Sequence, residues 1–463
     1  MRPTPMKFLR AVLERFVPRG AILLSVLTFG SYVMGLVRDR ILTGTFGAGV
    51  ELDTYNAAFV IPELTLGVIV ASGLAAPFIP IFSGLKRDGE PAAHAFGQTI
   101  LTLAVLAMGI SAAILFVIAP VTVEVVAPGF GPDQRVLYTD LFRVMTITPV
   151  IFAASIALGE ILIAERRFFF YGSAPLLYNA GIVVGTLAFS ADLGIFSAAI
   201  GAVVGALAHL AIRLWGIRRT TFRIRPRLAV RTAAIREFFL LMLPKTGSSP
   251  IEPLTFLFFT NIASTLVAGS VTSVSLARNF QSVPVSLIGV AFSLAVFPAM
   301  SAAYAAGDRR GLIRLVGTNA ATIGVITLAA AVGLVVVGEV AIRVLLGGGR
   351  FDEEAIARTA LVLAAFAISV PLESLGHLLS RAIYATHHTI WQVVASLIGF
   401  AVTVGATVGL VETVGIVAIP LGFGAGHGVR LALLAVVLTD RLRRGPPAAA
   451  TGSTAAVPPR PSG

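Results

Sequence analysis

The chain has 463 residues, of which 56% are hydrophobic and only 13% are charged. An average soluble domain carries about 25% charged residues, so this composition excludes a soluble protein of one to three domains. Long apolar runs recur from end to end, and they predict an all-α polytopic membrane protein. The chain contains no cysteine, which excludes disulfides, thiolate metal sites and a catalytic thiol.

Twelve apolar segments are long enough to cross a bilayer as helices, which takes about 20 residues each. Runs such as 99–119 are apolar on every side, so the alternating pattern of a membrane β-barrel is excluded. The predicted spans are residues 20–42, 54–83, 95–119, 136–163, 172–190, 195–217, 237–267, 271–299, 314–346, 356–385, 390–410 and 413–440.

Basic residues are distributed unevenly between the two sides of the predicted bundle. Of the 35 basic residues, 25 lie on the side of the N-terminus, seven lie on the opposite side and three lie within spans. Cytoplasmic loops are enriched in Lys and Arg, so we expect both termini to lie in the cytoplasm. The stretch from Arg213 to Arg236 contributes eight of these residues, and contact with anionic headgroups is favoured there over nucleic acid.

The chain contains an internal repeat with a period near 220 residues. Pro62–Val68 matches Pro284–Val290, and Leu158–Glu160 matches Leu375–His377. Each half holds six predicted helices, so the two halves share one topology and form two pseudo-symmetric six-helix lobes. The predicted organisation is an N-terminal segment 1–19, a first lobe 20–219, a basic linker 220–236, a second lobe 237–444 and a disordered tail 445–463.

Several charged side chains fall within the predicted spans, where a charge costs at least about 2.5–3.5 kcal/mol unless it faces a cavity or a partner. Arginine forks bind phosphate oxygens bidentately, so arginines around one cavity would suit an anionic headgroup. The alternatives are that Arg38 pairs with Asp39 or reaches the interface, and that Glu160 and Glu373 serve packing or carry protons. The candidates for substrate binding are Arg38, Arg143, Lys245, Arg278 and Asn279, and those for charge balance or ion coupling are Asp39, Asp53, Glu63 and Glu252.

Prolines concentrate in the predicted second, seventh and eighth spans. Each proline removes a backbone hydrogen bond, which is tolerated in lipid where helices flank a cavity or bend. We therefore expect these three spans to line the cavity and to move.

Several motifs together resemble one known family. Gly35–Asp39 is followed by Phe46–Gly49, Asp53 and Pro62, and later segments match as well: Phe78–Pro80, Ala174–Asn179, Ala268–Pro298 and Gly348–Phe351. Over about residues 20–444 the sequence is similar to the lipid II flippase MurJ (MviN) family, which belongs to the MOP exporter superfamily with the MATE transporters.

The resemblance implies a V-shaped MOP/MATE-like fold with a central cavity, in the bacterial cytoplasmic membrane. It implies alternating access that carries an undecaprenyl-diphosphate-linked glycan, lipid II, from the inner to the outer leaflet. Arg38, Asp39 and Asp53 carry over by motif match as functional charges. Membrane lipids and cell-wall synthesis proteins are the other implied partners. No cofactor is implied, and a monovalent cation or the membrane potential would supply the coupling.

The sequence also departs from the family pattern. Tyr32 and the Leu66–Gly67 pair stand where arginines are usual, and the arginine of span eight is Arg278, one residue before its usual place at Asn279. Three alternatives therefore remain: another polyprenyl-linked glycan as substrate, a MATE-like ion-coupled exporter, and a non-transporting cell-wall scaffold. The sequence shows no catalytic constellation or nucleotide-binding loop, so an enzyme is not expected.

Overall fold

The computed structural model describes residues 19–246, 251–386 and 390–444, which form helices, their connections and one isolated bridge between Gly348 and Phe351. The all-helical prediction is confirmed. The chain divides into two compact units: unit 1 holds residues 1–277 and 337–362, and unit 2 holds the rest. The predicted tail 445–463 and all but the last residue of the predicted segment 1–19 lie outside the described residues.

Besides residues 337–362, which belong to two helices shared with unit 2, unit 1 contains the helices of the first half of the chain and those that follow the basic connection. They are α2 (Arg19–Phe46), α3 (Val50–Leu66), η1 (Gly67–Ala71), α4 (Ser72–Asp88), α5 (Glu90–Val126), α6 (Pro132–Met145), α7 (Ile147–Ala164), α8 (Phe168–Gly172), α9 (Ala174–Leu193), α10 (Phe196–Ile217), α11 (Ala233–Thr246), α12 (Ile251–Ser264) and the start of α13 (Ser270–Pro284). Its core near the start of α5 is aromatic, with Phe78, Phe82 and Phe96 packed together.

Unit 2 contains most of the remaining helices. They are the end of α13, η2 (Val285–Val290), α14 (Ala291–Ala305), most of α15 (Arg309–Leu345), the end of α16 (Glu353–Ala367), α17 (Ser369–Ala385), α18 (Ile390–Val414), η3 (Gly415–Val417) and α19 (Ala418–Arg444). The boundary between the units therefore passes through α13, α15 and α16, whereas the predicted lobes 20–219 and 237–444 divide the chain between α10 and α11. That division stays a prediction.

Eight helices of the described residues are long and apolar enough to cross a membrane, and α16 with α17, bent by 41°, gives a ninth. One of the eight, Ile390–Arg443, holds two predicted spans that are separated by η3. The predicted spans 54–83 and 237–267 correspond to α3–η1–α4 and to α11 with α12, which are interrupted helices. Each of the twelve predicted segments thus has a helical counterpart.

Two π-helical turns occur in the part of the chain that the structure describes, one in each half. η1 covers Gly67–Ala71 and η2 covers Val285–Val290. Each contains the Gly-Val pair of the repeated Pro62–Val68 and Pro284–Val290 motif. A π turn interrupts the regular α-helical hydrogen-bond ladder and is frequent at functional sites. The two turns place a local irregularity at the repeated motif in each half.

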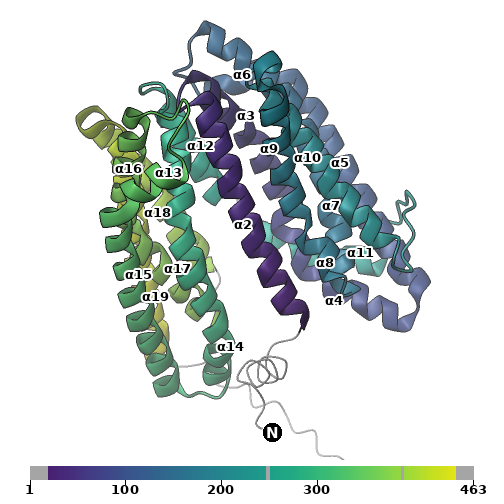
Figure 1. Ribbon diagram of the computed structural model, residues 1–463. Coiled ribbons are helices and arrows are strands. Elements are labelled where there is room, and N and C mark those ends of the chain that lie inside the picture. The colour runs from purple at the N-terminus through teal and green to yellow at the C-terminus, as the bar shows by residue number, and fades with distance from the viewer. Residues whose placement is uncertain (1–18, 247–250, 387–389, 445–463) are drawn as a thin grey trace, which may run out of the picture. The chain divides into compact units, whose positions relative to one another are not determined.

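Glycines bring two helix pairs into close contact. In unit 1, α9 and α10 lie side by side (Figure 1), with Gly181 against Gly205 and Gly185 against Gly201, so the pair is antiparallel. In unit 2, Gly399 of α18 lies against Gly426 of α19 in the same manner. Small residues let helix backbones approach closely, which strengthens van der Waals packing in a membrane. Each half of the chain therefore ends in a tightly packed helical hairpin.

The α9–α10 hairpin gives a first testable prediction. A Cβ atom at Gly185 would lie 2.6 Å from the Cα atom of Gly201. We expect Gly185→Ala to lower the free energy of unfolding by about 1–3 kcal/mol, because the helices must move apart. Gly109→Ala in α5 is the matched control, since a Cβ atom there meets nothing within 4 Å. Thermal unfolding followed by tryptophan fluorescence compares the two, and equal melting temperatures would contradict the prediction.

Candidate functional site

Arg38 and Asp39 lie near the end of α2 and form an ion pair. The Nε and Nη2 atoms of Arg38 donate to Asp39 Oδ1 at 3.0 and 2.7 Å. Its Nη1 atom donates to Asn179 Oδ1 on α9 at 3.0 Å, and Asn179 Nδ2 donates to the Pro175 carbonyl at 3.2 Å. The pairing of Arg38 with Asp39, one of the two alternatives in the sequence, is what the structure shows. The guanidinium is held in place yet keeps 27% of its side chain exposed.

Other polar groups surround Arg38. Glu63 and Tyr55 on α3 and Tyr178 on α9 lie within electrostatic range of its guanidinium. The Tyr178 ring packs edge-on against Phe152 at 5.0 Å between ring centroids. Sequence reasoning named Glu63 but missed both tyrosines, because tyrosine is ordinary in a membrane span and only the fold brings α3 and α9 to Arg38. The result is a mixed-charge polar cluster in unit 1 with one partly exposed cation.

Asp53 is buried, with 3% of its surface exposed, and it caps another helix. Its Oδ2 atom accepts from the Gly269 amide at 2.7 Å, and its Oδ1 atom accepts from the Thr272 amide at 2.8 Å and the Thr272 hydroxyl at 2.6 Å. These amides begin α13, where unsatisfied N–H groups and the helix dipole favour a carboxylate. Gly269 has a φ of +90°, a conformation that favours glycine. Asp53 thus ties the start of α3 to the start of α13.

Further contacts in unit 1 join three segments, residues 40–53, 264–273 and 344–358. We call these three segments the clasp. Arg40 Nη1 donates to the Val344 carbonyl at 2.8 Å. The amide of Arg350 donates to the Gly44 carbonyl at 2.8 Å, and Arg358 Nη1 donates to the Ala268 carbonyl at 2.6 Å. The side chains of Arg40 and Arg358 and the backbone of Arg350 therefore hold main-chain carbonyls of the clasp.

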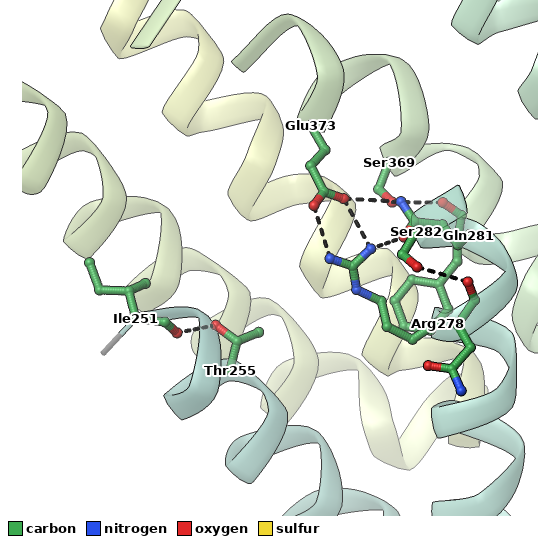
Figure 2. A network of polar contacts seen from close by, with 9 residues as sticks. Ile251, Thr255, Arg278, Gln281, Ser282, Ser369 and Glu373 are labelled. Carbon is green, nitrogen blue, oxygen red and sulfur yellow. Dashed lines mark hydrogen bonds and ion pairs between the residues drawn. The ribbon is translucent and has the colours of Figure 1, made fainter. Parts of the chain in front are cut away.

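Arg278 is buried in unit 2 and forms a bidentate ion pair with Glu373 (Figure 2). Its Nη1 and Nη2 atoms donate to the two carboxylate oxygens at 3.2 and 2.9 Å. Arg278 also contacts Gln281 Oε1, and Gln281 Nε2 donates to Glu373 and to Ser369 at 3.0 and 3.1 Å. The guanidinium lies over the Phe423 ring at 4.9 Å from its centroid. The fork that a phosphate would use is occupied here by Glu373.

The remaining predicted residues have different surroundings. Arg143, at the end of α6, lies over the Phe116 ring at 5.3 Å and 4.0 Å from Asp140. Asn279 and Glu252 are exposed. Lys245 belongs to α11, but its side chain lies outside the described residues. Arg143 and Arg38 thus have separate partners within unit 1, and convergence of the candidate cations on one cavity stays a prediction.

Arg213 corrects one prediction. It was counted with the basic connection, but it lies inside α10 and only 5% of its surface is exposed. Its Nη1 atom donates to the Ser155 carbonyl at 2.5 Å, its guanidinium lies over the Tyr171 ring, and it packs on Gly159. The predicted span 195–217 agrees with α10 and already includes Arg213, so the error lies in assigning an arginine near the end of the span to the connection that follows it.

The second half of the chain repeats this arrangement. Arg430 in α19 packs near Gly376 of α17, as Arg213 in α10 packs on Gly159 of α7. The two glycines are 217 residues apart in the sequence, and so are the two arginines. Arg430 Nη2 donates to Ser380 Oγ at 3.1 Å. The structure therefore supports the internal repeat at the level of single side chains.

Taken together, the helical bundle, its repeat and its arginines within spans define a multi-pass membrane protein, and its fold matches those of solved membrane transporters. A solved lipid II flippase MurJ in an inward closed conformation matches with a TM-score of 0.77, at 20% identity, over 90% of this chain and 87% of that one. An inward-facing multidrug resistance MATE family transporter of the MOP superfamily matches with a TM-score of 0.77, at 13% identity, over 91% of this chain and 98% of that one.

The sequence comparisons identify the family. The family model described as lipid II flippase MurJ matches residues 42–456, and the chain belongs to this family. A probable lipid II flippase MurJ from Rickettsia prowazekii is 24% identical over 90% of this chain and 82% of the relative. A protein of the same description from Thermotoga maritima is 28% identical over 86% of this chain and 81% of the relative.

Proposed function

We propose that this protein is a lipid II flippase, which moves the undecaprenyl-diphosphate-linked peptidoglycan precursor from the inner to the outer leaflet of the cytoplasmic membrane. The observation that carries the proposal is the family match over residues 42–456, joined to arginines placed within membrane spans. Transport leaves the substrate chemically unchanged, so no catalytic group is required. The excess of basic residues on one side supports an orientation with both termini in the cytoplasm.

Arg38 is the first residue that we assign to the diphosphate. Asp39 and Asn179 fix its guanidinium, while 27% of the side chain stays exposed to an arriving ligand. A diphosphate carries more charge than the Asp39 carboxylate, so it can compete for the same donors. Arg278 is held by Glu373 and would bind phosphate only after leaving that partner. Asn279, Arg143 and Lys245 are the further candidates for substrate contact.

We expect the same charges to couple transport to the membrane potential. Moving one elementary charge across a membrane potential of 100 mV changes its free energy by about 2.3 kcal/mol. A charged headgroup carried past Arg38 would therefore respond to the potential, and a monovalent cation could balance it at Asp39 or Glu63. Membrane lipids surround the transported tail throughout, and cell-wall synthesis proteins would receive the product.

Complementation tests the proposal directly. In bacteria depleted of their own lipid II flippase, we expect this chain to restore growth and Arg38→Ala to lose the rescue at equal expression. Arg87→Ala is the matched control, because Arg87 is an exposed arginine at the end of α4. In proteoliposomes, fluorescent lipid II should become accessible to an impermeant quencher at a rate that falls at least about tenfold in Arg38→Ala, as expected for a lost charge-assisted pair.

The outcomes of these experiments test the substrate assignment and the Arg38 assignment separately. If the wild-type chain fails to flip lipid II but moves another polyprenyl-linked glycan, the substrate assignment is wrong and the transporter class stands. If Arg38→Ala flips lipid II at the wild-type rate, the Arg38 assignment is wrong. If a well-expressed wild-type chain moves neither lipid, the flippase proposal itself is overturned and a scaffold role takes its place.

A further inference from the structure

The connection between α10 and α11 holds an irregular segment, residues 222–230, that lies along the N-terminal part of α5 (Figure 1). We call it the strap. At its start the Phe222 ring is buried, with 1% of its surface exposed, and packs edge-on against His94 at 5.4 Å between centroids. Phe222 also closely approaches Gly97 of α5. The strap is therefore anchored on α5 by a buried aromatic ring.

Hydrogen bonds fix the rest of the strap to the same helix. Gln98 Nε2 donates to the Arg223 carbonyl at 2.7 Å. The amide of Arg227 donates to Thr102 Oγ1 at 3.1 Å, and the amide of Ala229 donates to Thr99 Oγ1 at 3.3 Å. Polar side chains of α5 thus form hydrogen bonds with backbone groups of the strap. Apart from the buried Phe222 ring, the side chains from Arg223 to Leu228 are exposed, and Arg223 Nη1 donates to the Thr220 carbonyl at 3.4 Å.

Those side chains alternate between arginine and apolar residues. Arg223, Arg225 and Arg227 are exposed, and they alternate with Ile224, Pro226 and Leu228. The strap therefore presents exposed cationic and aliphatic side chains together. Ile224 and Leu228 are 46% and 57% exposed. In the part of the chain that the structure describes, none of the three guanidiniums has an ion-pair partner.

The length of α5 places the strap at the membrane surface. Its 37 residues span about 55 Å at 1.5 Å per residue, against a hydrocarbon thickness of about 30 Å. The helix exceeds the hydrocarbon by about 25 Å, so its N-terminal part, which the strap contacts from His94 to Thr102, can reach the membrane surface. Arg167 Nη2 donates to the Arg219 carbonyl at 2.7 Å, which brings further basic residues to this end of unit 1.

We propose that the strap is a binding surface for anionic phospholipid headgroups. Its arginine forks match phosphate oxygens, and its exposed Ile224 and Leu228 suit the boundary between headgroups and acyl chains. Each arginine at an anionic membrane surface strengthens association by about fivefold. Three arginines therefore bind such a surface more tightly than a single exposed arginine does. The strap would gather anionic lipids beside unit 1 whether or not the protein carries lipid II.

The absence of cysteine permits a site-specific test. Leu228→Cys introduces one thiol into the full-length chain for an environment-sensitive fluorophore. The labelled protein is reconstituted in vesicles of fixed phosphatidylglycerol and phosphatidylcholine content, with either lipid brominated. We expect brominated phosphatidylglycerol to quench the label at least about twofold more than brominated phosphatidylcholine, and the difference to fade in 1 M salt, where the Debye length is about 3 Å.

Two triple variants serve as test and matched control. Arg223→Gln/Arg225→Gln/Arg227→Gln should abolish the preference for phosphatidylglycerol. Three exposed arginines of the turn that opens α15 (Arg309, Arg310 and Arg314) lose the same charge when changed to Gln, and the preference should remain. Equal quenching by both lipids in the wild-type background overturns the proposal, and so does an equal loss of preference in the two triple variants. The salt dependence is measured without the triple substitutions, so this part of the test does not depend on whether the triple variants fold.

Discussion

Replacing Asp53 with alanine is expected to open the clasp and lower the free energy of unfolding by about 3–5 kcal/mol. The substitution leaves two backbone amides and one hydroxyl without their buried acceptor, and each hydrogen bond to a charged group contributes about 1.5–3 kcal/mol. It also removes the carboxylate that caps α13. Amide hydrogen exchange across residues 266–276 should accelerate at Gly269 and Thr272, and thermal unfolding should shift downward.

Two milder variants calibrate this effect. Asp53→Asn keeps the shape and one acceptor oxygen, so it should lose roughly half as much stability as Asp53→Ala. Thr272→Val removes the hydroxyl that donates to Asp53 and accepts from Asn56 Nδ2 at 3.2 Å, and it should cost about 1–3 kcal/mol. The double variant Asp53→Ala/Thr272→Val should be less destabilised than the sum of the two, because the two residues share one contact. Unchanged exchange at Gly269 in Asp53→Ala would rule out the capping role.

The second large effect is expected at Arg278. Arg278→Leu leaves the Glu373 carboxylate buried without its bidentate partner, and breaking such a pair costs about 3–5 kcal/mol. The double variant Arg278→Leu/Glu373→Leu should recover most of this loss, since apolar replacement of a whole buried pair is often neutral. The hydrogen bond from Gln281 to Ser369 can persist in the double variant. Thermal unfolding measured by the fluorescence of the two tryptophans compares the three proteins.

The double variant also distinguishes a role of Arg278 in stability from a role in transport. If it is stable but no longer flips lipid II, Arg278 contacts the substrate during the cycle. If it is stable and flips at the wild-type rate, the arginine serves only to hold α13 against α17. A double variant no more stable than Arg278→Leu alone would show that the pair is not the source of the stability.

The fold was largely predictable because membrane helices are encoded by local composition. Length, hydropathy and the repeat predict all twelve segments, and a charge in an apolar run identifies Arg278 and Asp53 as unusual. Their partners were not predictable in the same way. Asp53 meets Gly269 and Thr272 more than 200 residues later in the sequence, and such pairs depend on how the helices pack. The sequence therefore identifies each polar candidate by itself, and only the structure shows which residues it contacts.

The two π turns have a consequence for the history of the chain. Each contains the Gly-Val pair of a motif that occurs once in each half. A π turn can be described as a helix that has gained one residue, and here η1 begins at the Gly-Val pair whereas η2 ends at it. Duplication and fusion of an ancestral six-helix protein that already had an irregular turn at this pair would account for both. Because an even number of helices gives both copies the same topology, that ancestor could have paired with itself as a parallel homodimer. The irregular turn would then be older than the fused chain that now contains it twice.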